Sequence, residues 1–278
     1  MSNMPEMQGD LPSEPRRGQE TRAERAETRG ERGDEGGRGG VFCYAETAAV
    51  VTAVLFPVLI TWVYFIALAG AAPGLQQAAY GLGKSLQFAL PILWVAIFRR
   101  QRLVLRGPQR AGLLDGLAFG LVVFAAALLL YHLWLKPSGY LVPAAGVVRD
   151  KIAAFYVDSL WKYAAMGVFY CVIHAFLEEY YWRWFVFDEL RRLLPVAAAI
   201  AVSALGFTLH HILVLGFYFG WFSIATWFFS LAVAVGGAFW AWLYHRSGSL
   251  YGPWLSHLLI DAAIFAVGYD MVKGWLAT

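Results

Sequence analysis

Seven apolar runs constrain this 278-residue chain more than any other feature of its sequence. A helix needs about 20 mainly apolar residues to cross the hydrocarbon core of a lipid bilayer. The runs lie near residues 45–70, 84–98, 111–135, 159–187, 195–216, 224–245 and 250–269. We therefore predict an all-α fold, a polytopic bundle of about seven transmembrane helices. The run at 84–98 is short, so we expect it to cross with little tilt or to be partly re-entrant.

The composition agrees with this prediction. The chain is 59% hydrophobic and only 15% charged, whereas a soluble domain is about one quarter charged. Aromatic residues, which favour membrane interfaces, make up 17%. So apolar a surface has no basic face for nucleic acid, and we expect the lipid bilayer, not nucleic acid, as the surroundings. The two cysteines, Cys43 and Cys171, are too few for a disulfide framework.

The N-terminal segment differs in kind from the rest of the chain. Residues 16–40 mix Arg, Glu and Gly and contain no aromatic residue. Such a segment cannot bury enough apolar surface to offset its conformational entropy. We expect a disordered charged tail over residues 1–42 and one membrane domain over 43–278, with a motif-bearing core at about 159–270. Residues 141–158 carry charges at helical spacing and predict an interfacial amphipathic helix.

The cations between the runs indicate an orientation. Arginines cluster after the second run and follow the fourth and sixth, whereas the alternate loops hold few cations, the first being Lys84. The positive-inside rule then predicts a cytoplasmic N-terminus and, with seven spans, a C-terminus on the other side. Because Arg outnumbers Lys and because Ala and Gly are abundant, we expect a bacterial plasma membrane.

Ionisable side chains lie inside three of the apolar runs. At the bilayer centre each costs roughly 2.5–3.5 kcal/mol on insertion scales. They are His174, Glu178, Glu179 and Arg183 in the fourth run, His210 and His211 in the fifth, and His257 and Asp261 in the seventh. So many polar groups exceed what contacts between helices require, and we interpret them as a functional site.

Helical spacing sorts the groups of the fourth run. Glu179 and Arg183 are four residues apart, with the acid first, which is the favourable order for an ion pair. Glu178 points about 100° away from Glu179 and shares its face with His174, four residues earlier. Arg183 therefore neutralises only Glu179 well, and we expect the two carboxylates to have different roles.

The fifth and seventh runs supply the other groups. The hairpin between the fourth and fifth runs turns near residues 193–194. At 1.5 Å per residue, Glu178 and His211 both lie roughly 23–26 Å from that turn and can meet. His257 and Asp261 are four residues apart and face one cavity. His210 points about 100° away from His211, and we interpret it as a partner in an interhelical hydrogen bond.

This arrangement suits hydrolysis. A buried carboxylate beside a second carboxylate favours general-base chemistry, and histidine can share or pass on a proton. A second histidine on another helix can stabilise an oxyanion. Together these groups predict that water is activated against a peptide carbonyl inside the membrane.

Three motifs carry a resemblance to a known family. Glu178-Glu179-x-x-x-Arg183, Phe207-x-x-x-His211 and His257-x-x-x-Asp261 occur in that order. Over roughly residues 160–265 the chain resembles the CPBP family, the CAAX prenyl proteases and bacteriocin-processing intramembrane proteases. The resemblance implies a helical intramembrane endopeptidase of glutamate type, which requires no cofactor and acts on a membrane-delivered protein or peptide.

The resemblance also implies roles for single residues. Glu178 is the base that activates water, with help from His211, and His257 with residue 261 forms the oxyanion site. Glu179 and Arg183 support this geometry, together with Phe207 of the second motif. The family frequently has Asn at the position of Asp261. Because an ionised Asp has no donor, we expect Asp261 either to orient His257 or to stay protonated.

Three alternatives stay open. In a metal-dependent version of the same protease, Glu178, His211 and His257 are ligands for Zn²⁺, which accepts oxygen and nitrogen donors. In a non-catalytic version, the chain is a bacteriocin immunity factor or a scaffold. A proton- or ion-coupled transporter would use the same carboxylates, but we find no repeat of the kind transporters show.

Overall fold

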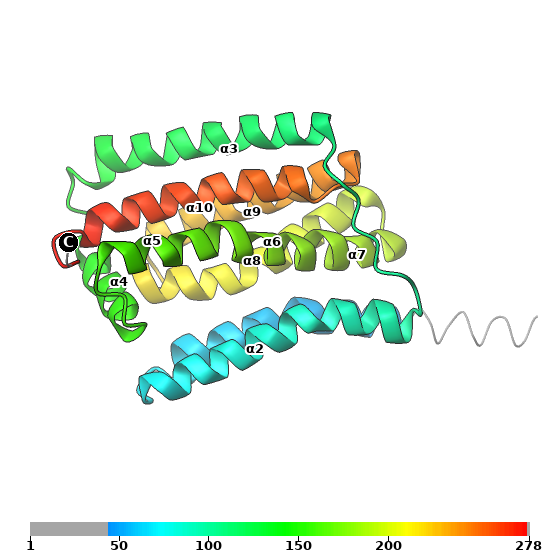
Figure 1. The fold of residues 1–278 in the computed structure, drawn as a ribbon, viewed down its shortest axis with the longest axis horizontal. Coiled ribbons are helices and arrows are strands. Elements are labelled where there is room, and N and C mark those ends of the chain that lie inside the picture. Colours follow the sequence, from blue (N-terminus) through cyan, green and yellow to red (C-terminus); the bar gives the residue numbers. More distant parts are fainter. Residues whose placement is uncertain (1–43, 277–278) are drawn as a thin grey trace, which may run out of the picture. The chain divides into compact units, whose positions relative to one another are not determined.

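A computed structural model describes residues 44–276 of the protein (Figure 1). The tail predicted over residues 1–42 lies outside the described residues. Within them the fold is all-α, and seven helices are long and apolar enough to cross a membrane. The prediction of a polytopic transmembrane helical bundle is thus confirmed.

The seven candidate spans follow one another along the chain. They are the first helix (Tyr44–Ala67), the second span (Pro73–Phe98), the third span (Arg110–Leu135), the fourth span (Leu160–Leu193), α8 (Val196–Phe219), α9 (Ile224–Ser247) and α10 (Tyr251–Val272). The second span consists of α2 (Pro73–Leu93) and a π-helical end, and the third consists of α3 (Arg110–Leu130) and a π-helical end. The fourth span consists of α5 (Leu160–Val168), α6 (Ala175–Glu179) and α7 (Asp188–Leu193), joined by π-helical segments.

The second span is longer than predicted. The sequence indicates a short run at 84–98, but the helix extends over Pro73–Phe98, 26 residues. Proline at the first helical position is pre-organised for a helix start, and Pro73 occupies that position here. Two of the polar side chains that hide the first half of this span, Gln76 and Gln77, are half-buried and donate hydrogen bonds to the backbone oxygens of Ala71 and Ala154. The expectation of a short or re-entrant segment is therefore wrong.

The helix predicted at 141–158 is present but shorter, as α4 (Val142–Ala154). It packs against α10 and α8, with Ile152 buried. The Lys151 ammonium lies 4.6, 5.2 and 4.9 Å from the ring centroids of Tyr64, Phe65 and Phe217. Cation–π contacts thus tie α4 to the first helix and α8, so α4 is docked on the bundle.

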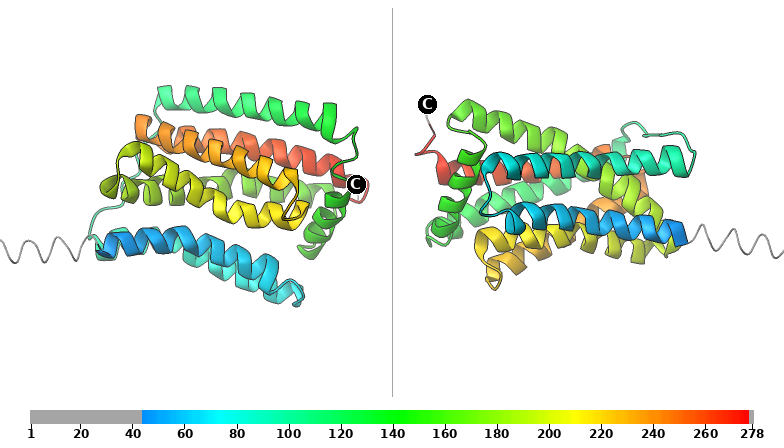
Figure 2. Two further views of the ribbon diagram at one scale, coloured as in Figure 1. Left: turned by 180° about the vertical axis from the view of Figure 1, so that it is seen from behind. Right: turned by 90° about the horizontal axis from the view of Figure 1, so that it is seen from below.

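Helix α3 lies along α10 (Figures 1 and 2), and glycines permit the close approach. Gly112, Gly116 and Gly120 are the buried residues of α3. A Cβ atom added to Gly116 would lie 2.2 Å from the backbone oxygen of Gly252. Small residues at four-residue spacing are how transmembrane helices bring their backbones together. This contact holds α10, which carries the third motif.

An ion-pair cluster ties together three helix ends. The Arg99 guanidinium at the end of the second span lies 2.9 Å from Glu46 of the first helix and also binds Glu189 of α7. Glu189 is buried, so its charge requires such a partner. The cluster fixes the second span against α7, and hence against the helix that bears the first motif.

Candidate active site

The fourth span is irregular where its acidic residues lie. The α-helical turn Ala175–Glu179 is flanked by π-helical segments at Phe169–His174 and Tyr180–Phe187. In Figure 1, α5, α6 and α7 follow one line, so the irregularity does not break the span. Such π-helical insertions rotate the faces of a helix and are frequent at functional sites.

The carboxylate of Glu178 is the centre of the candidate site. Glu178 is only 3% exposed. Its Oε1 lies 3.8 Å from Lys84 Nζ, 3.8 Å from His174 Nε2 and 3.7 Å from His210 Nε2. Its Oε2 lies 3.8 Å from His257 Nε2. These nitrogens come from the second span, the fourth span, α8 and α10, so separate transmembrane helices converge on one carboxylate.

The separations have a chemical meaning. At 3.7–3.8 Å the four nitrogens lie beyond direct hydrogen-bond distance from the carboxylate. A polar contact of this length is suited to a bridging water molecule. The four nitrogens therefore surround the Glu178 carboxylate but leave its oxygens free to accept a hydrogen bond from water. A base that activates water requires such a free acceptor.

Glu179 has a different set of partners. It is fully buried, and its Oε2 lies 3.1 Å from Nε of Arg183, as the four-residue spacing predicts. Its Oε1 lies 2.8 Å from Nδ1 of His257. The guanidinium of Arg183 is stacked 4.8 and 5.1 Å from the ring centroids of Phe207 and Trp240. Glu179 thus joins the first motif to the third, and Phe207 of the second motif packs on the same cation.

The bond to Glu179 sets the orientation of His257. Because Nδ1 points at Glu179, Nε2 faces Glu178. The Trp240 ring stacks on the imidazole at 4.3 Å between centroids. Asp261 Oδ1 lies 3.8 Å from Nε2 of His257, too far for a direct bond. The orienting role considered for Asp261 therefore belongs to Glu179, and that expectation is corrected.

Of the two adjacent histidines on α8, His210 lies within 3.7 Å of the Glu178 carboxylate. The spacing predicts that place for His211, with His210 pointing about 100° away. His211 instead donates from Nδ1 to the Phe207 carbonyl, 2.9 Å away. The two rings lie 4.1 Å apart, and His210 stacks in parallel on Trp182. Helix α8 thus brings His210 to the carboxylate, with the His211 ring packed against His210.

Sequence reasoning missed Lys84. It was interpreted as a loop cation because the predicted run began at that residue, whereas it lies inside α2. The signal was available, since a lysine inside an apolar span is as costly as a glutamate and needs a partner. His174, which was predicted only to share a face with Glu178, also borders the carboxylate.

A metal-dependent version of the site requires a group of side chains that can hold an ion together. Among residues 44–276, no three His, Cys, Asp or Glu side chains form a group that could hold a metal ion. Glu178, His211 and His257, the zinc ligands of the metal-dependent alternative, therefore do not form such a group.

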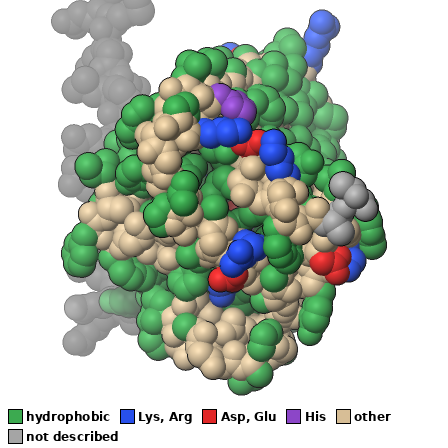
Figure 3. All heavy atoms as spheres, turned by 90° about the vertical axis from the view of Figure 1, so that its left-hand side faces the viewer, with side chains coloured by type: hydrophobic (Ala, Val, Ile, Leu, Met, Phe, Trp, Pro, Cys, Tyr) green, Lys and Arg blue, Asp and Glu red, His purple; other side chains and the backbone are tan. Residues whose placement is uncertain are grey.

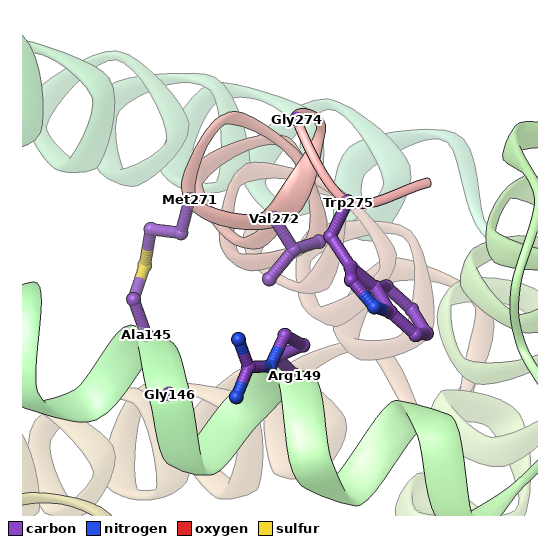
Figure 4. A pocket seen from close by; sticks show the side chains of 7 residues that line it. All are labelled: Ala145, Gly146, Arg149, Met271, Val272, Gly274 and Trp275. Atoms are coloured by element: carbon purple, nitrogen blue, oxygen red, sulfur yellow. The ribbon is translucent and has the colours of Figure 1, made fainter. Parts of the chain in front are cut away.

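A cavity of about 240 Å³ lies away from these residues, between α4 and the end of α10 (Figure 4). Figure 3 shows the end of the molecule at the left of Figure 1, where small mixed groups of acidic and basic side chains lie among hydrophobic ones. Near the end of α10, Asp270 pairs with both Lys136 and Lys273. The cavity is lined by Ala145, Gly146, Arg149, Met271, Val272, Gly274 and Trp275. None of these residues belongs to the three motifs.

Comparisons with known proteins point to a family. A family described as type II CAAX prenyl endopeptidase Rce1-like matches residues 160–263. No curated protein and no solved structure matches the chain. The matched segment contains all three motifs and the Glu178 carboxylate, and the match supports membership of the CPBP family and a peptidase activity.

Proposed function

We propose that this CPBP-family membrane protein is an intramembrane endopeptidase in which Glu178 activates a water molecule to cleave a membrane-delivered protein or peptide. The observation that carries this proposal is the buried carboxylate faced by nitrogens from separate helices at 3.7–3.8 Å. A group held in this way is placed for proton transfer. The family match over residues 160–263 supports the same conclusion.

The proposed reaction is ordinary amide hydrolysis. Glu178 removes a proton from water while the water oxygen bonds to the peptide carbonyl carbon, and the carbonyl electron pair moves onto its oxygen. The tetrahedral intermediate then collapses, the carbon–nitrogen bond breaks, and the nitrogen takes up the proton. His257 acts as an imidazolium: its Nδ1–H is held by the Glu179 carboxylate, and its Nε2–H is donated to the oxyanion. His210 and His211 hold the water and share its proton. This scheme uses no cofactor.

The proposed setting is the bacterial plasma membrane, with the N-terminus in the cytoplasm. A comparison of membrane proteomes tests the function there. We expect a Glu178→Gln strain to accumulate one or more membrane proteins that keep an additional terminal segment, which the wild type removes. Identical terminal peptides in both strains would contradict the proposal. Restoration of the wild-type phenotype by the Glu178→Gln protein would instead favour an immunity factor or a scaffold.

Metal analysis separates the two versions of the enzyme. We expect purified protein that has been freed of metal by a chelator to retain its activity on a reporter peptide. Loss of activity on chelation, with recovery on adding Zn²⁺ alone, would establish the metal-dependent version in place of the one proposed here.

A further inference from the structure

Lys84 brings a positive charge to the candidate active site from a helix outside the three motifs. It lies in α2, and its side chain is 12% exposed. Its ammonium lies 3.8 Å from Oε1 of Glu178. The ammonium also lies over the rings of Tyr80 and Phe88, with Nζ 5.7 and 5.5 Å from their centroids.

The direction of this side chain is informative. A lysine in a membrane span normally extends its long stem toward the interface to keep its charge in water. Lys84 instead points into the bundle, where two aromatic rings and one carboxylate receive its charge. An inward lysine of this kind is costly unless it pairs, and its partner is the proposed base itself.

The two carboxylate oxygens of Glu178 face different side chains. Lys84 lies on the side of Oε1, and Nε2 of His257 lies on the side of Oε2. The third motif provides no further donor from an ionised Asp261, because a carboxylate only accepts hydrogen bonds. Lys84, on the other side of the carboxylate, offers a second positive group for a developing oxyanion.

We propose that Lys84 is a catalytic residue that stabilises the oxyanion of the transition state, an inference that rests on the proposed function. During the attack, Glu178 gains a proton from water and loses its negative charge, while the carbonyl oxygen gains that charge. The Lys84 ammonium, next to Glu178, keeps its proton throughout. Its charge balances the carboxylate before the step and the oxyanion after it.

A fixed cation is effective in this role. The negative charge moves between two groups that meet at one site, so the ammonium need not reorganise as the reaction proceeds. In the apolar interior of the bundle its interaction is also stronger than in water. The cation–π contacts with the rings of Tyr80 and Phe88 hold the ammonium in place.

Kinetics of reconstituted full-length protein test the role. The probes are two quenched-fluorescent reporters, a farnesylated CAAX peptide and a transmembrane peptide. For the reporter that is cleaved, we expect Lys84→Met to lower kcat by about 10²-fold, the usual effect of losing one oxyanion donor, with KM within about twofold. Lys84→Arg, which keeps the charge, restores part of the rate. Lys162→Met, at a half-buried lysine paired with Asp158, leaves kcat unchanged.

The same measurement can overturn the proposal. An unchanged kcat in Lys84→Met, or a fall in kcat that Lys84→Arg does not relieve, would show that the charge has no part in the reaction. A rise in KM alone would assign Lys84 to substrate binding and would equally refute it.

A thermal-unfolding cycle separates failure of this inference from failure of the proposed function. We expect Lys84→Met to lower Tm in the wild-type background, because it leaves the Glu178 carboxylate without its cation, and to have a smaller effect in Glu178→Gln. Equal Tm changes in both backgrounds would refute the pairing. If the wild type cleaves neither reporter, the catalytic role fails together with the proposed function, and the cycle still decides the pairing.

Discussion

Glu178 and Glu179 are adjacent in sequence and differ in how closely they contact their partners. Glu179 binds Arg183 and His257 directly, at 3.1 and 2.8 Å. Glu178 faces its nitrogens at longer range. The sequence predicts this division, since neighbouring helical residues point about 100° apart and one arginine serves one of them. It does not predict that Glu179 also reaches His257, because that contact depends on how two helices pack.

The double role of Glu179 leads to a stability prediction. Glu179→Gln removes the charge that balances buried Arg183. Leaving one partner of a buried ion pair typically costs about 3–5 kcal/mol of unfolding free energy. We therefore expect a clear fall in Tm, measured by thermal unfolding in detergent. Asp150→Asn serves as the matched control, since Asp150 is exposed and, among residues 44–276, pairs only with Arg149. Equal Tm values for the two variants would contradict the account.

Histidine assignment shows the limit of sequence reasoning at this scale. Spacing places His211 at the depth of Glu178, and the depth is right for the hairpin as a whole, because α7 ends at Leu193 and α8 starts at Val196. The spacing of residues around the hairpin does not determine how α8 is rotated about its own axis. It follows from contacts such as the stack of Trp182 on His210, which no spacing rule contains.

Among the elements, α3 and α10 depend most on close backbone contact. Gly116→Ala would place a methyl group 2.2 Å from the backbone oxygen of Gly252, so the helices must separate. We expect overpacking to cost about 1–3 kcal/mol and to displace α10, which lowers both Tm and activity.

Gly81→Ala is the control for that change, because a Cβ at Gly81 meets nothing within 4 Å. It is expected to leave Tm unchanged or slightly higher, since Ala is the better helix former by about 1 kcal/mol. Similar Tm values for both variants would show that the contact between α3 and α10 tolerates a methyl group, which would contradict the account.

The docking of α4 gives a second prediction at this scale. Lys151→Met keeps the stem but removes the charge that contacts Tyr64, Phe65 and Phe217. Each cation–π contact contributes about 0.5–2 kcal/mol, so we expect faster hydrogen exchange at the amides of α4. Lys151→Arg keeps the contacts and should preserve the protection. Exchange that is unaltered in Lys151→Met would mean that other contacts hold α4.

Element boundaries were predicted less well than element types. Apolar runs identify spans by length, so the polar first half of the second span was assigned to a loop although it is helical from Pro73. The π-helical segments on either side of Glu178 were not predicted either. They depend on packing of the whole helix rather than on any residue pattern.

At the scale of the whole molecule, the number of spans follows from the sequence, because each apolar run must lie in the bilayer. The orientation stays a prediction. In a background of Cys43→Ser and Cys171→Ser, a cysteine at Arg102 is expected to react with a membrane-impermeant maleimide only from the cytoplasmic side. A cysteine at Ser138, in the loop after the third span, should react only from the other side. The reverse pattern would invert the topology.

Single-turnover cleavage of the two reporter peptides in proteoliposomes tests most directly whether separate helices converge on a carboxylate that activates water. Because Glu178→Gln removes the base, we expect it to lower the single-turnover cleavage rate by about 10²–10⁴-fold, the contribution of a general base. Glu189→Gln, at the buried acid paired with Arg99, serves as the control for loss of a buried carboxylate and should cleave at close to the wild-type rate once folded. Cleavage by Glu178→Gln at the wild-type rate would contradict the claim.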